Sequence, residues 1–191
     1  SHGMILGEGG IKMSKSRDNV IGPEDVMGPY GVDALRQWAA AGSSTGQDIL
    51  FNWNDVVAAS RFQTKMWNIV RFSLSQIQKE SPVPKTDAPS TLIDRWMLAN
   101  LSKTVADVTE AMESYLFDKG LKIVRDFAWN VMADEYLEFV KGRLYSEEPE
   151  RAGAVYTLET TLDAMCTMLA PYIPFFAQEC YHHLSGGKRI I

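Results

Sequence analysis

Apolar residues recur at a helical spacing in the second quarter of the chain. From Asn54 onward they lie along one side of a helix of about 25 residues. The members of this stripe are Val56, Ala59, Phe62, Met66, Ile69 and Ile77. A period of about 3.6 residues is typical of an amphipathic helix that buries one side. We therefore predict one long helix here, with its polar side in solvent.

A proline-rich connection, residues 81–89, separates this helix from the next, because proline cannot continue a helix. The next helix opens at Ser90 or Thr91, where Thr91 and Asp94 form an acidic variant of the capping box. Its apolar residues repeat at intervals of three and four: Leu98, Leu101, Val105, Val108 and Met112. This repeat predicts the seam of a helical bundle.

Further helices complete the predicted bundle. Asp118 can cap a third helix, whose apolar side begins with Phe117, Leu121, Val124, Ala128 and Val131. The stripe then moves to Trp129, Met132, Tyr136 and Phe139, so we expect two neighbours to share this helix. A fourth helix buries Val155, Leu158, Leu162, Met165 and Leu169. It is stopped by Pro171, and a fifth helix runs from Pro174 to about Leu184.

Shorter elements precede the long helix. Residues 4–6 are typical of a short strand, which we expect to be poorly held without sheet partners. Residues 22–25 form a helix start, with proline at the first position and acids in the first turn, and Gly28-Pro29 ends that helix. A second helix runs from about residue 32 to 41, and Gly42 terminates it.

These elements predict a mostly α-helical chain in two parts. The first is a small loop-bearing segment over residues 1–50. The second, residues 51–191, is an antiparallel bundle of about five helices, since short connections join neighbours that run in opposite directions.

Composition restricts the possible function classes. Of 191 residues 46% are hydrophobic, which is enough for a sizeable core. The net charge of −5 argues against a nonspecific nucleic-acid binder, although local basic faces stay possible. Cys166 and Cys180 lie in apolar stretches, so we expect two buried free thiols and a reducing cytoplasm. Neither a membrane span nor a signal peptide is indicated.

The candidate chemistry lies close to the N-terminus. Residues 12–16 read Lys-Met-Ser-Lys-Ser and follow a glycine-rich turn at residues 7–10. Glycine allows close backbone approach, lysine supplies compact positive charge and serine supplies hydrogen bonds, so such a loop can hold a polyphosphate. Taken alone, however, the pentapeptide is more often an ordinary solvated loop.

Other polar clusters have two interpretations each. Arg61, Lys65, Asn68 and the nearby Arg71 lie on one side of the long helix, either as a solvated face or as contacts to RNA phosphates. Acids at 134, 135 and 138 are better explained by ion pairs with Lys141 and Arg143 than by acid-base catalysis. His182 and His183 point to different sides of a helix, so no metal site is expected.

The lysine pentapeptide has a specific context. It is followed by Asn19-Val20-Ile21, Pro23 and the run Tyr30-Gly31-Val32-Asp33-Ala34-Leu35-Arg36, and this whole string resembles the signature of class I aminoacyl-tRNA synthetases. The resemblance implies that Lys12, Met13, Ser14, Lys15 and Ser16 close over ATP, with Mg²⁺ expected in the full enzyme. Lys15 would stabilise the pyrophosphate as the amino acid is adenylated, because charge builds up there in the transition state. The family usually has glycine where Asp18 stands.

Nearly the whole chain takes part in this resemblance. It makes residues 1–50 the stem-contact segment at the end of a catalytic domain, and residues 51–191 the anticodon-binding bundle. Residues 62–72, 129–141 and 169–175 also look like the family. The sequence Gly46-Gln47-Asp48-Ile49 followed by Phe51 looks most like the valine-specific members, which implies ATP, valine and a valine-accepting tRNA as partners of the full enzyme.

Two rival interpretations stay open. The chain could come from the isoleucine-specific branch of the same family, or it could be a stand-alone helical interaction or RNA-binding module with an inert lysine loop. No nucleotide-binding motif precedes residue 12 in this sequence, so we expect a C-terminal piece that does not activate an amino acid by itself.

Overall fold

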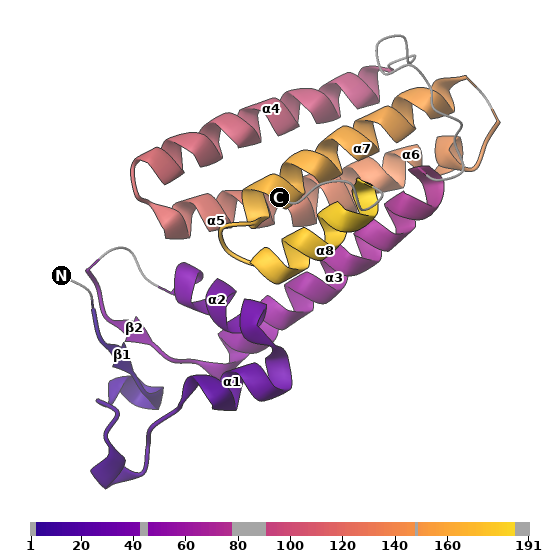
Figure 1. The fold of residues 1–191 in the computed structure, drawn as a ribbon. Helices are drawn as coiled ribbons and strands as arrows, with labels where there is room; N and C mark the ends of the chain where they lie inside the picture. Colours follow the sequence, from indigo (N-terminus) through magenta and orange to yellow (C-terminus); the bar gives the residue numbers. More distant parts are fainter. Residues whose placement is uncertain (1–2, 43–45, 78–90, 148, 186–191) are drawn as a thin grey trace.

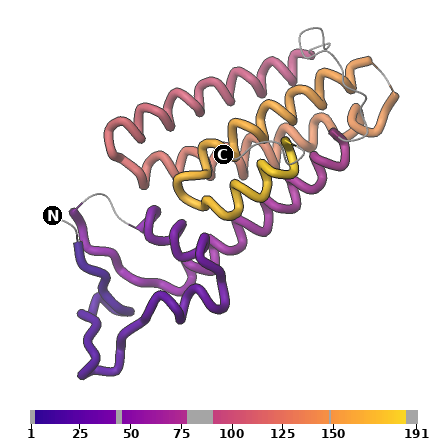
Figure 2. The backbone as a smooth tube through the Cα atoms, viewed as in Figure 1, coloured from indigo at the N-terminus to yellow at the C-terminus, as the bar shows by residue number. Residues whose placement is uncertain are grey.

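The computed structural model describes residues 3–42, 46–77, 91–147 and 149–185, and Figures 1 and 2 show the course of the backbone. The elements, in chain order, are β1 (Ile5–Leu6), η1 (Glu8–Gly10), η2 (Lys15–Arg17), α1 (Pro23–Tyr30), α2 (Val32–Ala41), β2 (Ile49–Leu50), α3 (Trp53–Ile77), α4 (Leu92–Glu113), α5 (Phe117–Asp126), η3 (Phe127–Tyr136), α6 (Leu137–Leu144), α7 (Glu150–Leu169) and α8 (Pro174–Leu184). The mostly helical class is confirmed. The proline-rich connection at 81–89 lies outside the described residues.

In the described part of the chain, five helical stretches form the larger core: α3, α4, the continuous run α5–η3–α6, α7 and α8. Successive members run in opposite directions, as predicted (Figure 1). Fully buried side chains at the centre include Met66, Met97, Met132, Tyr136, Leu158, Leu162 and Met165. The stripes predicted for α3 and α7 are buried, apart from Ile77, which is only partly covered.

The buried side of α4 differs by about one position from the predicted seam. It comprises Asp94, Met97, Leu101, Thr104, Val108 and Ala111. Val105, predicted in the seam, is 38% exposed. Thr104 can be buried because its hydroxyl donates to the Asn100 carbonyl at 2.8 Å within the same helix. A prediction from apolar residues alone therefore placed the buried side of α4 about one position away from where it lies.

The third bundle helix changes its buried face at η3, a π-helical stretch. A π-turn spans more residues than an α-turn, so it rotates the following side chains around the axis. The buried set is Leu121, Val124 and Ala128 before the shift, and Met132 and Tyr136 after it. Phe117 and Phe139 do not belong to it: they are 43% and 60% exposed, because Phe117 starts the helix at a corner and Phe139 packs edge-on against Trp96 at the surface. Asp118 lies in the first turn and does not cap it.

A smaller core holds the N-terminal elements together. Val26, Trp38, Phe51 and Val56 are its buried members, from α1, α2, the segment after β2, and α3. The strand at residues 5–6 has a partner after all: β1 pairs in parallel with β2. This pairing corrects the expectation of an unpaired strand, which failed because the partner is remote in sequence.

The helix α1 continues through Gly28-Pro29 to Tyr30, where the prediction had ended it. Proline has a helical φ, so near the end of a short helix it removes one backbone hydrogen bond without stopping the chain's course. The helix ends at Gly31, whose φ of 84° suits glycine and whose N–H donates to the Met27 carbonyl at 2.9 Å.

A buried carboxylate connects α4 to α6. Asp94 is fully buried, and Arg143 donates to both of its oxygens at 2.8 and 2.6 Å. The Tyr136 hydroxyl adds a bond at 2.8 Å, and Thr91 completes the predicted capping box. Arg143 therefore pairs between helices, whereas a pair within its own helix was expected. Burial alone would raise the pKa of Asp94, but the bonds from Arg143, Thr91 and Tyr136 outweigh it and hold that pKa below its ordinary value.

Removing the cation should destabilise the bundle. In Arg143→Ala, Asp94 stays buried without its charge partner, so we expect the free energy of unfolding in urea to fall by about 3–5 kcal/mol. Arg95→Ala, which removes an exposed arginine from the same α4, is the matched control and should change it by less than about 0.5 kcal/mol. A loss below about 1 kcal/mol in Arg143→Ala would contradict this role.

The Asp94 carboxylate should also make the free energy of unfolding depend on pH. Because the folded-state pKa of Asp94 is lowered, its contribution is present above the ordinary carboxyl pKa of about 4 and is lost as pH falls through the folded-state value. Urea unfolding between pH 7 and 2 measures this. Asp94→Asn should flatten the acid part of the curve, and an unchanged curve would count against the assignment.

Candidate functional site

The glycine-rich turn folds back on itself before the lysine pentapeptide. Gly9 and Gly10, in η1, have φ values of 71° and 77°, a conformation that glycine adopts readily. The Gly7 N–H donates to the Ile11 carbonyl at 2.8 Å, and an antiparallel bridge then pairs Leu6 with Lys12. The turn therefore fixes the point at which the lysine loop, residues 12–16, leaves the body of the protein.

Asn19 fastens the lysine loop from its far side. Its Oδ1 accepts a bond from the Ser14 N–H at 2.9 Å, and its Nδ2 donates to the Lys12 carbonyl at 3.4 Å. The Met13 sulfur accepts from the Ile21 N–H at 3.3 Å. Residues 12–14 of the loop are thus held by the segment that follows it, while the Lys15 side chain stays exposed.

The two loop lysines are exposed cations. Within the described residues, neither Lys12 nor Lys15 forms an ion pair, and both side chains lie in solvent. The Ser14 and Ser16 hydroxyls are 3.2 Å apart. Free ammonium groups beside paired hydroxyls can bind a phosphate chain, because no internal partner has to be displaced.

Asp18 follows the loop in a left-handed conformation, with φ 52° and ψ 34°. Glycine adopts this geometry without strain. Aspartate is among the few other residues that tolerate it. Its presence therefore preserves the turn while placing an acid next to the loop.

The predicted RNA-binding residues lie on α3. Arg61, Lys65 and Asn68 line one cavity of about 630 Å³ between α3 and the η3–α6 run, whereas Arg71 is exposed and lies outside its lining. Lys65 is already engaged: its Nζ is 2.8 Å from the Asp134 carboxylate and 3.6 Å from the centre of the Trp129 ring. Of the four residues, Lys65 therefore has the clearest structural role.

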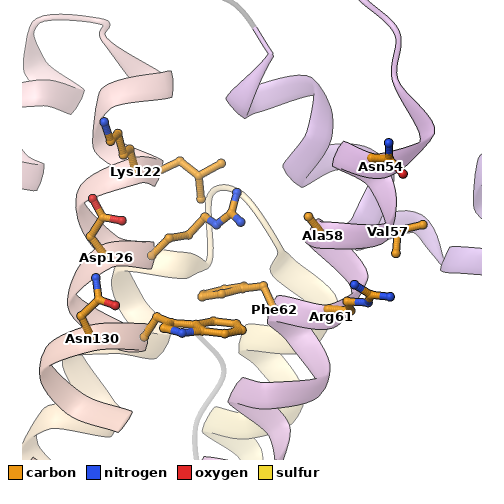
Figure 3. Close-up of a pocket in the computed structure, with 11 residues that line it drawn as sticks. Asn54, Val57, Ala58, Arg61, Phe62, Lys122, Asp126 and Asn130 are labelled. Carbon is orange, nitrogen blue, oxygen red and sulfur yellow. The ribbon is translucent and has the colours of Figure 1, made fainter. Parts of the chain in front are cut away.

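A second cavity, of about 720 Å³, lies between α3 and the α5–η3 run (Figure 3). Lys122, Asp126 and Asn130 line it from the α5–η3 run, and Asn54 and Arg61 line it from α3. Arg61 lines both cavities, so the two form neighbouring compartments along one side of α3.

A stack of side chains crosses the floor of this second cavity. Arg125 lies over the Phe62 ring at 5.3 Å, and that ring stacks on Trp129 with centroids 6.5 Å apart and an interplanar angle of 18°. Burial lowers the pKa of Arg125, although arginine stays charged. Sequence reasoning missed Lys122, Arg125 and Asn130. The sequence signal was two cations three residues apart, Lys122 and Arg125, followed by Trp129 one turn later. In the structure Trp129 is 37% exposed.

The remaining candidates have structural explanations. Lys141 pairs with Glu138 as predicted, but Asp134 pairs with Lys65 on another helix. His183 contacts Glu179 at the surface. Cys166 and Cys180 are buried and free, which confirms the prediction, and a hydrogen bond between them together with burial raises the pKa of the Cys180 thiol.

Two classes of site are not found in the described residues. No group of three or more His, Cys, Asp or Glu side chains there could hold a metal ion. No helix there is long and apolar enough to cross a membrane.

The lysine loop and the helical bundle each match a protein family. The family described as "Anticodon-binding domain of tRNA ligase" matches residues 94–191, and the family "tRNA synthetases class I (I, L, M and V)" matches residues 1–52. This chain belongs to the class I tRNA ligases that carry this anticodon-binding domain.

Within that class, the similar curated proteins are valine–tRNA ligases. The protein of Methanosarcina acetivorans is 51% identical over 188 residues, which is 96% of this chain and 22% of the relative. The protein of Archaeoglobus fulgidus is 49% identical over 98% of this chain and 22% of its own length. The chain therefore spans about a fifth of the length of these relatives.

Solved structures agree on the fold. A ternary complex of Agrobacterium radiobacter K84 agnB2 LeuRS with tRNA and LeuAMS has a TM-score of 0.75 at 21% identity, covering 100% of this chain and 22% of that chain. Methionyl-tRNA synthetase of Mycobacterium tuberculosis, bound to methionyl-adenylate, has a TM-score of 0.76 at 21% identity, covering 95% of this chain and 37% of that chain.

The hydrogen bonds of Asn19 should control the order of the lysine loop. In Asn19→Ala the Ser14 N–H loses its acceptor, so we expect its amide hydrogen exchange to accelerate at least about tenfold, measured by NMR. Asn52→Ala is the matched control, because Asn52 accepts a backbone bond from Asn54 outside the loop. Unchanged exchange at Ser14 would show that Asn19 does not hold the loop.

Proposed function

We propose that this chain is the part of a valine–tRNA ligase that supplies the ATP-closing lysine loop and the bundle that binds the anticodon arm of valine-accepting tRNA. The observation that carries the proposal is the identity of about half the residues with valine–tRNA ligases over nearly the whole chain. In this function residues 1–50 serve the catalytic domain and residues 51–191 serve tRNA binding. Such a ligase works in the cytoplasm, where translation takes place.

The lysine loop acts on ATP. Lys15 places its ammonium group against the pyrophosphate as adenylation proceeds, while Lys12, Met13, Ser14 and Ser16 complete the loop around the phosphates. The exposure and lack of ion pairs of Lys12 and Lys15 in the described structure support this role. Mg²⁺ would arrive bound to ATP, because phosphate oxygens are among its usual ligands.

The unfinished sheet supports a catalytic domain against this segment. Parallel strands are normally buried on both faces, but β1 and β2 form a two-stranded parallel pair in which Ile5 is 46% and Leu50 53% exposed. Met4 and Ile11, beside them, are equally open. A stand-alone interaction module does not explain the match to class I synthetases over residues 1–52.

The RNA-binding face combines the predicted residues with those that the structure adds. Arg61, Asn68 and Arg71 are exposed on α3, and Lys122 and Arg125 approach the same side from α5. Arginine and lysine bind phosphates, and exposed aromatic rings can stack on unpaired bases. Lys65 orients Trp129 and would contribute through it more than through a phosphate contact of its own.

Lys15→Ala, made in the full-length ligase, should slow adenylate formation by about two to three decades, because one preorganised group that stabilises the transition state is lost. Lys12→Ala should cost less. Single-turnover measurements of valine adenylation separate the rate of adenylate formation from the affinity for ATP. If both variants weakened ATP binding and kept the single-turnover rate, Lys15 would be a ground-state binder and its proposed role would be wrong. The 191-residue chain itself should show no valine-dependent exchange of pyrophosphate into ATP.

The chain should bind a valine anticodon stem-loop with an affinity that falls as salt rises, since neutralised phosphates release counterions. Each specific base contact is worth about 1–3 kcal/mol, so this stem-loop should outcompete the isoleucine one by at least about fivefold at equal salt. Fluorescence anisotropy competition measures both. Reversed preference would move the assignment to the isoleucine branch, and no RNA binding would favour the interaction module.

Single substitutions locate the face. Arg61→Ala should weaken binding of the valine stem-loop several-fold and lower its salt dependence, because an exposed phosphate-binding cation is removed. Arg95→Ala, an exposed arginine on α4, is the matched control and should leave affinity unchanged. Equal effects of the two variants would remove α3 from the interface.

A further inference from the structure

The run Asp33-Ala34-Leu35-Arg36 has no role in the chemistry described so far. Asp33 lies on α2 and is 6% exposed. Its Oδ2 accepts a bond from the Phe176 N–H, the third residue of α8, at 2.7 Å. The residue before α8 is Ile173, whose side chain cannot accept a hydrogen bond. Asp33 therefore performs for α8 the task that an N-cap side chain normally performs within one helix.

Arg36 lies one turn further along α2 and binds the connection between α7 and α8, which we call the α7–α8 corner. Its Nε donates to the Tyr172 carbonyl at 3.2 Å and its Nη2 to the Pro171 carbonyl at 2.9 Å. These carbonyls follow directly on the end of α7. An anion at the start of one helix and a cation at the end of another are both favourable with respect to the helix dipoles. The charges of Asp33 and Arg36 are therefore opposite to the partial charges of the helix ends that they contact at the α7–α8 corner.

The corner that they hold is itself fixed to the rest of the bundle. Tyr172 is 4% exposed, and its hydroxyl donates to the Phe117 carbonyl at the start of α5 at 3.0 Å. Gly120 leaves room for this ring, since a Cβ there would lie 2.6 Å from the hydroxyl oxygen. The α7–α8 corner is therefore a firm anchor and not a loose loop.

On its other side α2 leads to the lysine loop. Trp38 of α2 is buried in the smaller core, against which Ile21 packs, and the Ile21 N–H donates to the Met13 sulfur within the loop. The loop segment is thus joined to the bundle by α3, by the contact of α2 with α5, and by α2 on the α7–α8 corner (Figure 1). Attachments on several separate helices fix an orientation, whereas one would leave a hinge.

We propose that Asp33 and Arg36 are positioning residues: together they clamp α2 to the α7–α8 corner and so set the orientation of the lysine-loop segment relative to the RNA-binding face of the bundle. Neither residue touches ATP or RNA in this role. The clamp follows from the contacts alone, while its consequence for tRNA charging rests on the proposed function.

The clamp can be tested by distance measurement in the 191-residue chain. Spin labels at Glu24→Cys on α1 and Ser102→Cys on α4, both exposed, report the orientation of the segment. The unsubstituted clamp should give one narrow distance distribution. We expect Arg36→Ala, and more strongly Asp33→Ala with Arg36→Ala, to widen it at least twofold. Asp33→Asn keeps an acceptor for the Phe176 N–H, so its distribution should stay nearly as narrow as that of the unsubstituted chain.

Two controls separate positioning from general stability. Arg95→Ala removes an arginine elsewhere, and Val108→Ala weakens the bundle core on α4. Both should leave the distribution narrow at temperatures where circular dichroism shows a folded chain. An unchanged width in folded Arg36→Ala, or equal widening in Val108→Ala, would overturn the clamp.

A second measurement tests the consequence in the full-length ligase. Valine-dependent pyrophosphate exchange needs only the catalytic domain and the lysine loop, so Arg36→Ala should change it less than about twofold. Charging needs the far end of a bundle-bound tRNA to reach the active site, so kcat/KM for tRNA should fall about tenfold. Equal effects on both reactions, or none on charging, would overturn the positioning role. If the unsubstituted ligase fails to activate valine, the proposed function falls, and the distance measurement still decides the clamp.

Discussion

The constraint on which the rest of the structure depends is that one straight helix serves two cores. The helix α3 has 25 residues and is therefore about 37 Å long. Its first turn places Val56 in the smaller core, while Phe62 and the residues after it belong to the larger one. A continuous helix does not bend easily, so the lysine loop and the bundle stand at a distance that this helix largely sets. The surface left open along α3 is also where both cavities lie.

Buried aspartates complete the connection, in two different environments. Asp94 caps its own helix and receives two bonds from Arg143, so its pKa lies below the ordinary value. Burial raises the pKa of Asp33, and the N–H groups of Phe175 and Phe176 together with Arg36 only partly offset this effect. A bidentate guanidinium thus compensates burial where backbone donors do not. Both carboxylates still fix one element against another, because a buried acceptor is costly to leave unpaired.

Basic residues on the exposed side of α3 show why charge alone is a poor guide to a binding site. Lys65 looked equivalent to Arg61 in sequence, but it is occupied by Asp134 and Trp129. Arg61 lines both cavities, and Lys122 and Arg125 line the larger one from α5, a helix remote in sequence from α3.

The sequence by itself determined what depends on neighbours within a turn or two. Periodicity and capping were sufficient for the bounds of α2, for the Thr91–Asp94 box and for the start of α8 at Pro174, and the lysine pentapeptide was recognisable because its chemistry is contiguous. Only the tertiary structure decided the pairing of β1 with β2, the bond of Arg143 to Asp94 and the capping of α8 by Asp33. Each of these joins residues remote in sequence, and no local pattern specifies which distant partner will satisfy a buried polar group, since that depends on how whole helices pack.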